Sequence, residues 1–495
     1  MTSAAKKKTL PQFSLTEVAE GPGENVIQVD LPAENGGEVT YYTRPVGDVD
    51  PSTGRRRAKK PNWSPHTFPL FPVVLNADGS PWPEANLWVI DRLVGKVAPN
   101  MLSYAVIAED LAAFRRYIDE EKINWLSFPP FKLQRPTYRY NAYLRHSVEA
   151  AEISHSVARR RMGTVIGFYR WLKTAALFNP SNPTWVDSDH LVEWKNEHGF
   201  SGVLTVKTTD VSIKGKTVAD PYSEYIEDSG KLRPLPQAEQ KVLVQALTDL
   251  DNTEMSLIFL FSLFSGARIQ TVLTVRVRHV RQHPSEIVGN DFRLNAGPGT
   301  GIDTKNGTKG VLHLPKWFYE RLYIYAHSQR ARTRREKADG GNHIDQHLFL
   351  SYRGAPMYAS RPKRGELGRG PHVLRHPKNG QGVRQFLKEK LLPEMRLRLN
   401  NPRYKFRFHD LRATFGLNAA DSMLDKIKNN SIVYTQALGQ IRQLMWHSSP
   451  TTTEKYLQYR ENLALFDAVQ DGWNEHLANL AQRTLDVGVR VDAKD

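Results

Sequence analysis

Three fragments in the second half of the chain carry basic side chains that could do chemistry. MSLIFLFSLFSGARIQTV is an apolar run that ends at a serine and a glycine, after which Arg268 begins the next expected helix. FRLNAGPGTGIDTKNGTKGVLHLP contains two strand-like runs, with Lys305 and Lys309 in the turn region. FRFHDLRATF sets His409 and Arg412 three residues apart, and therefore on one face of a helix. Taken singly, each fragment has an ordinary structural explanation.

A fourth fragment brings a histidine close to two tyrosines. In QIRQLMWHSSPTTTEKYLQY, His447 precedes a turn of two serines and a proline, and an expected helix then carries Tyr456 and Tyr459. A tyrosine hydroxyl needs help to lose its proton, because its ordinary pKa lies near 10. A neighbouring histidine is a suitable proton acceptor.

These residue types suit the transfer of a phosphoryl group to a protein hydroxyl. Attack on a phosphodiester builds a second negative charge on the equatorial oxygens, and Arg268 and Arg412 could hold those oxygens with bidentate, charge-assisted hydrogen bonds. His409 and His447 could donate to the same oxygens or take the phenolic proton. Lys305 could protonate the leaving 5′ oxygen, which otherwise departs as a poor alkoxide. Chemistry of this kind requires no metal.

In order and local sequence, the four fragments resemble the active-site boxes of the tyrosine recombinase family, which includes phage integrases. Those boxes read as Gly-x-Arg at a helix start, a Thr-Lys-Asn/Thr-Gly hairpin, His-x-x-Arg, and Leu-Gly-His-Ser-Ser with the nucleophilic tyrosine nine residues after its histidine. The resemblance covers about residues 85 to 470. The catalytic residues that it implies are Arg268, Lys305, His409, Arg412, His447 and Tyr456.

The resemblance implies a site-specific DNA recombinase of the integrase or transposon-recombinase kind. Such an enzyme cuts and rejoins DNA through a covalent 3′-phosphotyrosine intermediate and a Holliday junction. Because the phosphotyrosine conserves the bond energy of the diester, we expect neither ATP nor any metal or other cofactor. The implied partners are double-stranded DNA, further copies of the chain in a tetramer on two DNA sites, and accessory proteins.

Three other functions remain open on the sequence alone. A type IB topoisomerase-like relaxing enzyme shares the chemistry without needing two DNA sites. A noncatalytic DNA-binding protein of the same fold would keep the boxes as a phosphate clamp. A metal nuclease built on His409 and Asp410 is the least favoured of the three.

The sequence departs from the family pattern at several positions. Thr271 stands where the family often has an acidic residue three positions after the first arginine, and Trp446 stands where glycine precedes the box histidine. The stretch from Arg412 to His447 is longer than in compact members, which predicts an insertion near residues 421–436. The hairpin also carries an extra residue, so that Lys309 competes with Lys305 for the role of general acid.

The elements that position these residues are expected to form a mainly α fold with small β elements. We expect a helical core-binding domain and an α+β catalytic domain that together form a clamp on DNA. The predicted segments are a partly ordered N-terminal extension over residues 1–84, a core-binding domain over 85–200, a linker over 201–231, a catalytic domain over 232–470 and a tail over 471–495. An apolar stripe in the tail predicts docking, either on a neighbouring protomer or on its own domain.

Two basic segments are candidates for contact with DNA. The helix expected over residues 154–173 carries Arg159, Arg160 and Arg161 in one turn. The segment over residues 361–382 contains five glycines and six lysines or arginines against one glutamate, and we expect Arg364 and Arg369 in it to reach DNA. A solvated basic surface is the alternative for both segments.

Charge and composition agree with a polyanion as the partner. The 495 residues carry 68 lysines and arginines against 52 aspartates and glutamates, which gives a net charge of +16. The absence of cysteine excludes disulfides and thiolate metal sites. No apolar run reaches the length of about 20 residues that a membrane span needs, and the N-terminus does not read as a secretory signal. We expect a cytoplasmic protein, associated with the nucleoid if bacterial.

Overall fold

The computed structural model describes most of the chain. The described residues are 4–14, 17–19, 22, 27–32, 38–44, 67–94, 96, 99–195, 201–215, 225–228, 230–359, 378–429 and 431–460. The chain divides into two compact units, one formed by residues 1–217 with 362–377 and the other by residues 218–361 with 378–495. The predicted tail and the residues Arg364 and Arg369 lie outside the described part.

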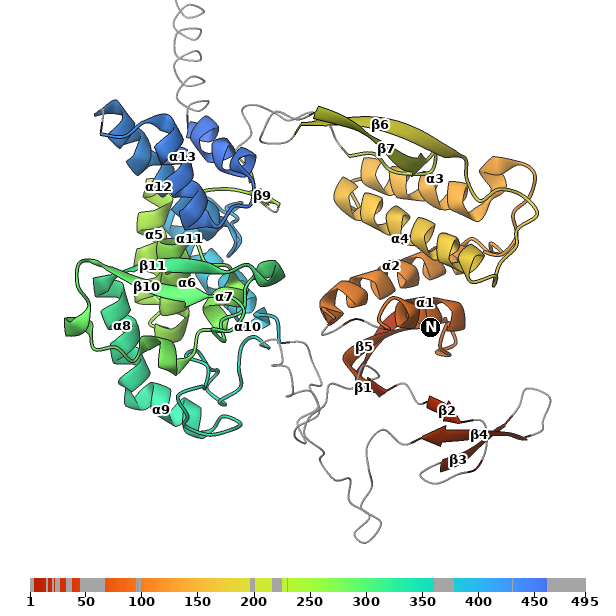
Figure 1. Ribbon diagram of the computed structural model, residues 1–495, viewed down its shortest axis with the longest axis horizontal. Helices are drawn as coiled ribbons and strands as arrows, with labels where there is room; N and C mark the ends of the chain where they lie inside the picture. Colours follow the sequence, from red (N-terminus) through yellow and green to blue (C-terminus); the bar gives the residue numbers. More distant parts are fainter. Residues whose placement is uncertain are drawn as a thin grey trace, which may run out of the picture. The chain divides into compact units, whose positions relative to one another are not determined.

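The first unit contains helices and small antiparallel sheets (Figure 1). Its helices are α1 (Pro83–Asp91), α2 (Met101–Glu120), α3 (Pro136–Glu149) and α4 (His155–Thr174). Its strands are β1 (Lys6–Ser14), β2 (Glu17–Ala19), β3 (Ile27–Pro32), β4 (Glu38–Arg44), β5 (Thr67–Leu75), β6 (Asp187–Lys195) and β7 (Ser201–Thr209). They form the sheets β1-β5, β2-β4-β3 and β6-β7.

The core of the first unit is rich in aromatic rings. Phe114 of α2 and Tyr140 of α3 meet edge to face, with ring centroids 4.9 Å apart, and Phe168 of α4 meets Trp82 in the same way at 5.4 Å. Edge-to-face pairs of this kind add to the stabilisation that burial alone provides. The helical periodicity of α2 and α4 therefore reflects one shared apolar core.

Strands form within the partly ordered extension expected over residues 1–84 and within the linker expected over residues 201–231. Strands β1 and β5 pair in an antiparallel register from Lys6↔Leu75 to Ser14↔Thr67, and Phe68 and Phe71 of β5 are buried beside Tyr104 of α2. Strand β7, inside the expected linker, pairs with β6. Its sequence, SGVLTVKTT, is rich in valine and threonine, which favour strands.

The second unit contains the four fragments with candidate catalytic residues. Its helices are α5 (Gln237–Asp249), α6 (Thr253–Ser265), α7 (Ile269–Leu273), α8 (Lys316–His327), α9 (Gln329–Glu336), α10 (Gln381–Phe386), α11 (Leu392–Arg398), α12 (Asp410–Lys428), α13 (Tyr434–Met445) and a last described helix over residues 450–460. The hairpin β10 (Asp291–Ala296) and β11 (Gly310–Pro315) and the short pair β8 (Ile226–Glu227) and β9 (Lys231–Leu232) complete it.

Two hydrophobic clusters hold the second unit together. The larger packs α5, α6 and α8 with the β10-β11 hairpin and includes Phe259, Phe261 and Phe318. The smaller joins α12, α13 and the helix over residues 450–460 to the β8-β9 pair, and Tyr456 belongs to it. The predicted insertion near residues 421–436 contains the end of α12 and the beginning of α13.

The mainly α fold with small β elements that the sequence predicts is confirmed by this element content. Among the described residues, no helix combines the length and apolar character that crossing a membrane requires.

Candidate active site

The end of α6 places Arg268. Gly266 ends the helix with a φ of 66°, and a Cβ at that position would come within 2.6 Å of the Phe415 ring, so that a glycine is needed there. Arg268 then stands at the start of α7. Burial, followed by the nearby charge of Arg412, lowers the pKa of Arg268 to about 10. Its Nε is buried without a hydrogen-bond partner among the described residues.

The first turn of α12 fixes Arg412. Both carboxylate oxygens of Asp410 accept backbone N–H groups, from Arg233 at 3.2 Å and from Arg407 at 2.7 Å. Arg412 is buried and donates through its terminal nitrogens to the carbonyls of Gly266, at 2.9 Å, and of Met445. The ends of α6 and α13 therefore hold one guanidinium between them. Asp410 thereby fixes the first turn of α12, which carries Arg412.

His409 lies at the start of the same helix. Burial, and then the positive charges of Arg268 and Arg412, lower its pKa to about 4. The imidazole is therefore neutral at pH 7 and carries one donor and one acceptor nitrogen. The positive charge of Lys305 also lowers the pKa of His409, since its ammonium lies near the imidazole.

His447 and Tyr456 come together across the turn that follows α13. The His447 Nδ1 lies 3.0 Å from the Thr453 hydroxyl, which orients the imidazole. The ring stacks on Tyr456 with centroids 5.6 Å apart and an angle of 28°. Tyr456 is fully buried, and burial, followed by the negative charge of Asp228, raises the pKa of its phenol.

Two ion pairs fix the helix that carries Tyr456. Arg460 donates to both oxygens of Asp421 on α12, at 2.7 and 2.5 Å. The Lys455 Nζ lies 3.2 Å from the Oε2 of Glu227 in β8. The helix is thus tied on one side to α12 and on the other to the β8-β9 pair.

Asp228 is the residue of this site that the sequence analysis missed. Its Oδ2 accepts hydrogen bonds from Arg412 Nε at 2.8 Å and Tyr456 Oη at 3.2 Å, and it lies 3.2 Å from His447 Nε2. Its Oδ1 lies 3.7 Å from a terminal nitrogen of Arg268. Burial alone would raise the pKa of Asp228, but the His447 hydrogen bond and the charge of Arg412 hold it well below its usual range.

Four side chains of the described residues contact the Asp228 carboxylate and are called the anion site below. They are Arg268, Arg412, His447 and Tyr456. Two guanidinium groups, an imidazole and a phenol can together stabilise an anion whose oxygens replace the carboxylate. The segment EDSGK reads locally as an ordinary turn, so that no local pattern indicates the role of Asp228.

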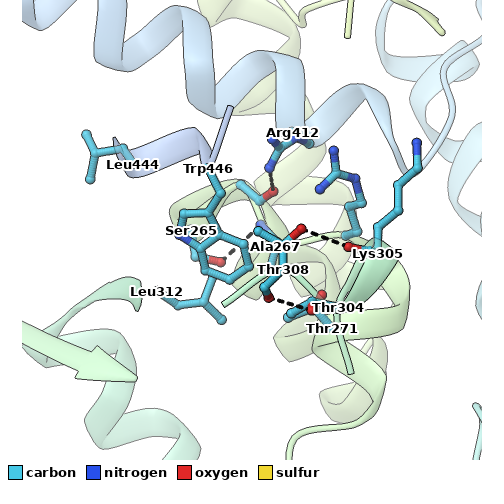
Figure 2. A pocket seen from close by; sticks show the side chains of 12 residues that line it. Ser265, Ala267, Thr271, Thr304, Lys305, Thr308, Leu312, Arg412, Leu444 and Trp446 are labelled. Atoms are coloured by element: carbon cyan, nitrogen blue, oxygen red, sulfur yellow. Dashed lines mark hydrogen bonds between the residues drawn. The ribbon is translucent and has the colours of Figure 1, made fainter. Parts of the chain in front are cut away.

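The lysine hairpin borders the same site. Lys305 begins a 3₁₀ turn, and Figure 2 shows that it lines a pocket together with Arg412, Thr308 and Trp446. The Thr308 hydroxyl donates to the Lys305 carbonyl at 3.0 Å and fixes the turn. Lys309 lines only the wider groove outside this pocket. The structure thus brings all six predicted catalytic residues into one neighbourhood.

Trp446 has a structural role that its position in the motif did not indicate. It ends α13 in the left-handed conformation, with a φ of 53°, where the resembling boxes have glycine. Its indole Nε1 donates to the Val311 carbonyl at 3.0 Å. The side chain therefore connects the end of α13 to strand β11, next to the lysine turn.

The three arginines predicted to meet DNA differ in their surroundings. Arg160 makes a two-pronged ion pair with the buried Asp110, with nitrogen to oxygen distances of 2.9 Å. Arg159 is exposed, and Arg161 is partly buried with its Nε lacking a partner among the described residues. Arg160 is thus engaged within its own unit, although both Arg159 and Arg160 are exposed.

Comparisons with known proteins give structural neighbours only. No protein-family model matches the sequence, and no curated protein matches it. Among solved structures, a lambda integrase dimer bound to a COC' core site shares 13% sequence identity at a TM-score of 0.41, over 76% of this chain and 95% of that one. The chain resembles the integrases. A Tn1549 transposon integrase in complex with circular intermediate DNA shares 11% identity at a TM-score of 0.42, over 76% and 94%. These integrases are of the tyrosine recombinase family that the motifs predicted.

Proposed function

We propose that this chain is a tyrosine site-specific DNA recombinase whose nucleophile is Tyr456. The observation that supports this most strongly is the convergence of Arg268, Arg412 and His447 with the Tyr456 hydroxyl on one carboxylate. A carboxylate and a phosphodiester both present a pair of oxygens that share one negative charge. Side chains that hold the first can therefore hold the second.

In the proposed reaction, the Tyr456 oxygen attacks the phosphorus of one DNA strand. A new bond forms between phosphorus and the phenolic oxygen, and the bond from phosphorus to the 5′ oxygen breaks. The phenolic proton passes to an imidazole, either that of His409 or that of His447, and Lys305 gives a proton to the departing 5′ oxygen. Arg268 and Arg412 stabilise the charge that builds on the other phosphate oxygens.

The product keeps a phosphodiester-like bond between the tyrosine and the 3′ end. A 5′ hydroxyl can attack the phosphorus and give its proton to Lys305, which restores the DNA backbone, while the bond from phosphorus to the tyrosine breaks and the phenolic oxygen takes its proton back from the imidazole. If that hydroxyl belongs to a second duplex, strands are exchanged through a Holliday junction without ATP. The proposed partners are double-stranded DNA and three further copies of the chain.

The experiment is to trap and map covalent DNA-protein adducts in cells that express the full chain. We expect adducts at defined sites with the protein on the 3′ ends. Tyr456→Phe should abolish them with little change in DNA binding, because one hydroxyl and no charge is lost, whereas Tyr459→Phe should retain them. Adducts that persist in Tyr456→Phe would refute this nucleophile.

A second readout separates recombination from DNA relaxation. We expect Holliday junctions when two copies of the mapped site are supplied. Adducts without junctions would favour a relaxing enzyme of the type IB kind. A complete lack of adducts with wild-type protein would favour a noncatalytic DNA-binding protein.

A further inference from the structure

The Asp228 carboxylate holds the groups that the proposed reaction needs. Its Oδ2 engages Arg412 Nε at 2.8 Å, and His447 Nε2 and Tyr456 Oη both lie 3.2 Å away. Arg268 lies on its other oxygen, 3.7 Å away. The carboxylate thus lies where the charged oxygens of a phosphodiester would have to lie for Tyr456 to attack.

We propose that Asp228 is an internal competitor of the DNA phosphate, which occupies the anion site in the resting chain and must leave it before cleavage. This inference rests on the proposed function, because it assigns a phosphodiester to the same site. It adds a form of regulation: a resting state in which the chain's own carboxylate blocks the nucleophile.

Electrostatics oppose catalysis while Asp228 is in place. A second anion among the same donors would be repelled by the carboxylate at short range and in a buried environment, where screening is weak. The negative charge of Asp228 also adds to burial in raising the pKa of Tyr456, which disfavours the phenolate. A carboxylate held by Arg412 and His447 is itself a weak base, so that it gains little from accepting the phenolic proton.

The local structure allows the carboxylate to leave without unfolding the unit. Asp228 follows β8, which pairs with β9 through only Ile226↔Leu232 and Glu227↔Lys231. Ile226 and Leu232 are buried in the same hydrophobic cluster as Tyr456 and anchor the pair on both sides of the turn. The side chain between these anchors is short, and the proposal requires only that it rotates or that the turn shifts.

A supporting role for Asp228 makes the opposite prediction. Thr271 stands where related sequences often have an acidic residue, and Asp228 could replace that acid by fixing Arg412 and Arg268. In that case, removal of its charge would loosen the anion site and weaken both anion binding and cleavage. For a competitor, removal of the charge strengthens both. The sign of the effect therefore decides between the two.

The test compares Asp228→Asn in the full chain with wild type and with Asp425→Asn, the same change at an exposed position of α12. Binding of inorganic phosphate is measured by calorimetry at constant ionic strength, and thermal unfolding verifies that each variant is folded. We expect Asp228→Asn to bind phosphate at least ten times more tightly than wild type, because the competing state is removed. Asp425→Asn should match wild type. Equal or weaker phosphate binding by Asp228→Asn would overturn the proposal.

A measurement on the wild-type protein covers the case in which the variant does not fold. Hydrogen exchange of the amides over residues 226–232 is followed as phosphate replaces chloride at fixed ionic strength. Displacement of Asp228 should speed exchange at the turn while the amides of α6 stay unchanged. Exchange at the turn that does not respond at saturating phosphate would overturn the proposal.

Covalent adduct formation separates failure of the inference from failure of the proposed function. If wild type forms adducts and Asp228→Asn neither binds phosphate more tightly nor forms more of them, the function stands and the competitor is refuted. If Asp228→Asn binds phosphate more tightly but no variant forms adducts, the competitor is supported and tyrosine transfer is refuted.

Discussion

The ring of Tyr456 lies directly over Gly416 of α12. A Cβ on this glycine would come within 2.5 Å of the tyrosine Cε1 and within 2.9 Å of the Met445 Cε. The glycine has helical backbone geometry, so that its reason for being there is space rather than conformation. One helix position thus provides the room for the proposed nucleophile.

Gly416→Ala should therefore displace Tyr456. We expect overpacking to lower the free energy of unfolding by about 1 to 3 kcal/mol. The yield of covalent adducts should fall by at least the same factor as the fraction of folded protein. Gly439→Ala in α13 is the matched control, because nothing lies within 4 Å of its Cβ position. That variant should gain up to about 1 kcal/mol. Denaturant unfolding and adduct yield measure both effects, and a fully active Gly416→Ala would contradict the packing argument.

Lys305→Ala should slow strand cleavage by about a hundredfold or more, since the leaving 5′ oxygen loses its proton donor. A DNA strand with sulfur in place of that oxygen should restore the rate, because a thiolate leaves without protonation. Lys309→Ala should change the cleavage rate of neither the ordinary strand nor the sulfur-containing strand by more than a few fold. Single-turnover cleavage of both substrates makes the comparison. Sulfur rescue of Lys309→Ala instead would reassign the general acid.

Stability should fall on acidification between about pH 6.5 and pH 4. Burial and neighbouring charges lower the pKa values of His409 and His347 to about 4, whereas an unfolded histidine titrates near 6.5. The unfolded state thus binds more protons in this window, and the free energy of unfolding rises with pH. We expect each imidazole to contribute on the order of 3 kcal/mol.

Thermal unfolding from pH 4 to pH 7 measures this dependence. The double variant His347→Gln/His409→Gln should show a flatter dependence than wild type. An unchanged slope would mean that neither imidazole is held neutral by the fold.

Substitution of Arg160 should mainly affect stability, whereas substitution of Arg159 should mainly affect DNA binding. Arg160→Ala leaves the fully buried Asp110 without its main partner, which should cost about 2 kcal/mol. Arg159→Ala should change stability by less than about 0.5 kcal/mol but reduce the salt dependence of DNA affinity by about one counterion. Unfolding curves and affinity at several salt concentrations test both. A destabilised Arg159→Ala with an unchanged salt dependence would reverse the assignment.

The sequence alone predicted the local features of the chain. The apolar periodicity of α2 and α4 and the order of the four fragments depend on neighbours within a few residues of one another, and such patterns can be read along a chain. They led to the mainly helical fold and to six residues that the structure brings together. The same reading interpreted residues 201–231 as a linker, whereas the structure has strand β7 over Ser201–Thr209.

The tertiary structure alone decided which distant groups meet. Asp228 reaches Arg412, His447 and Tyr456 across about two hundred positions of sequence, and no local pattern records a contact of that range. The same holds for Arg160, whose charge is taken up by Asp110 of another helix. The spacing of apolar residues along a helix or strand indicates which side chains are buried. The pKa of a polar side chain depends instead on the burial and the charged groups that the fold places around it.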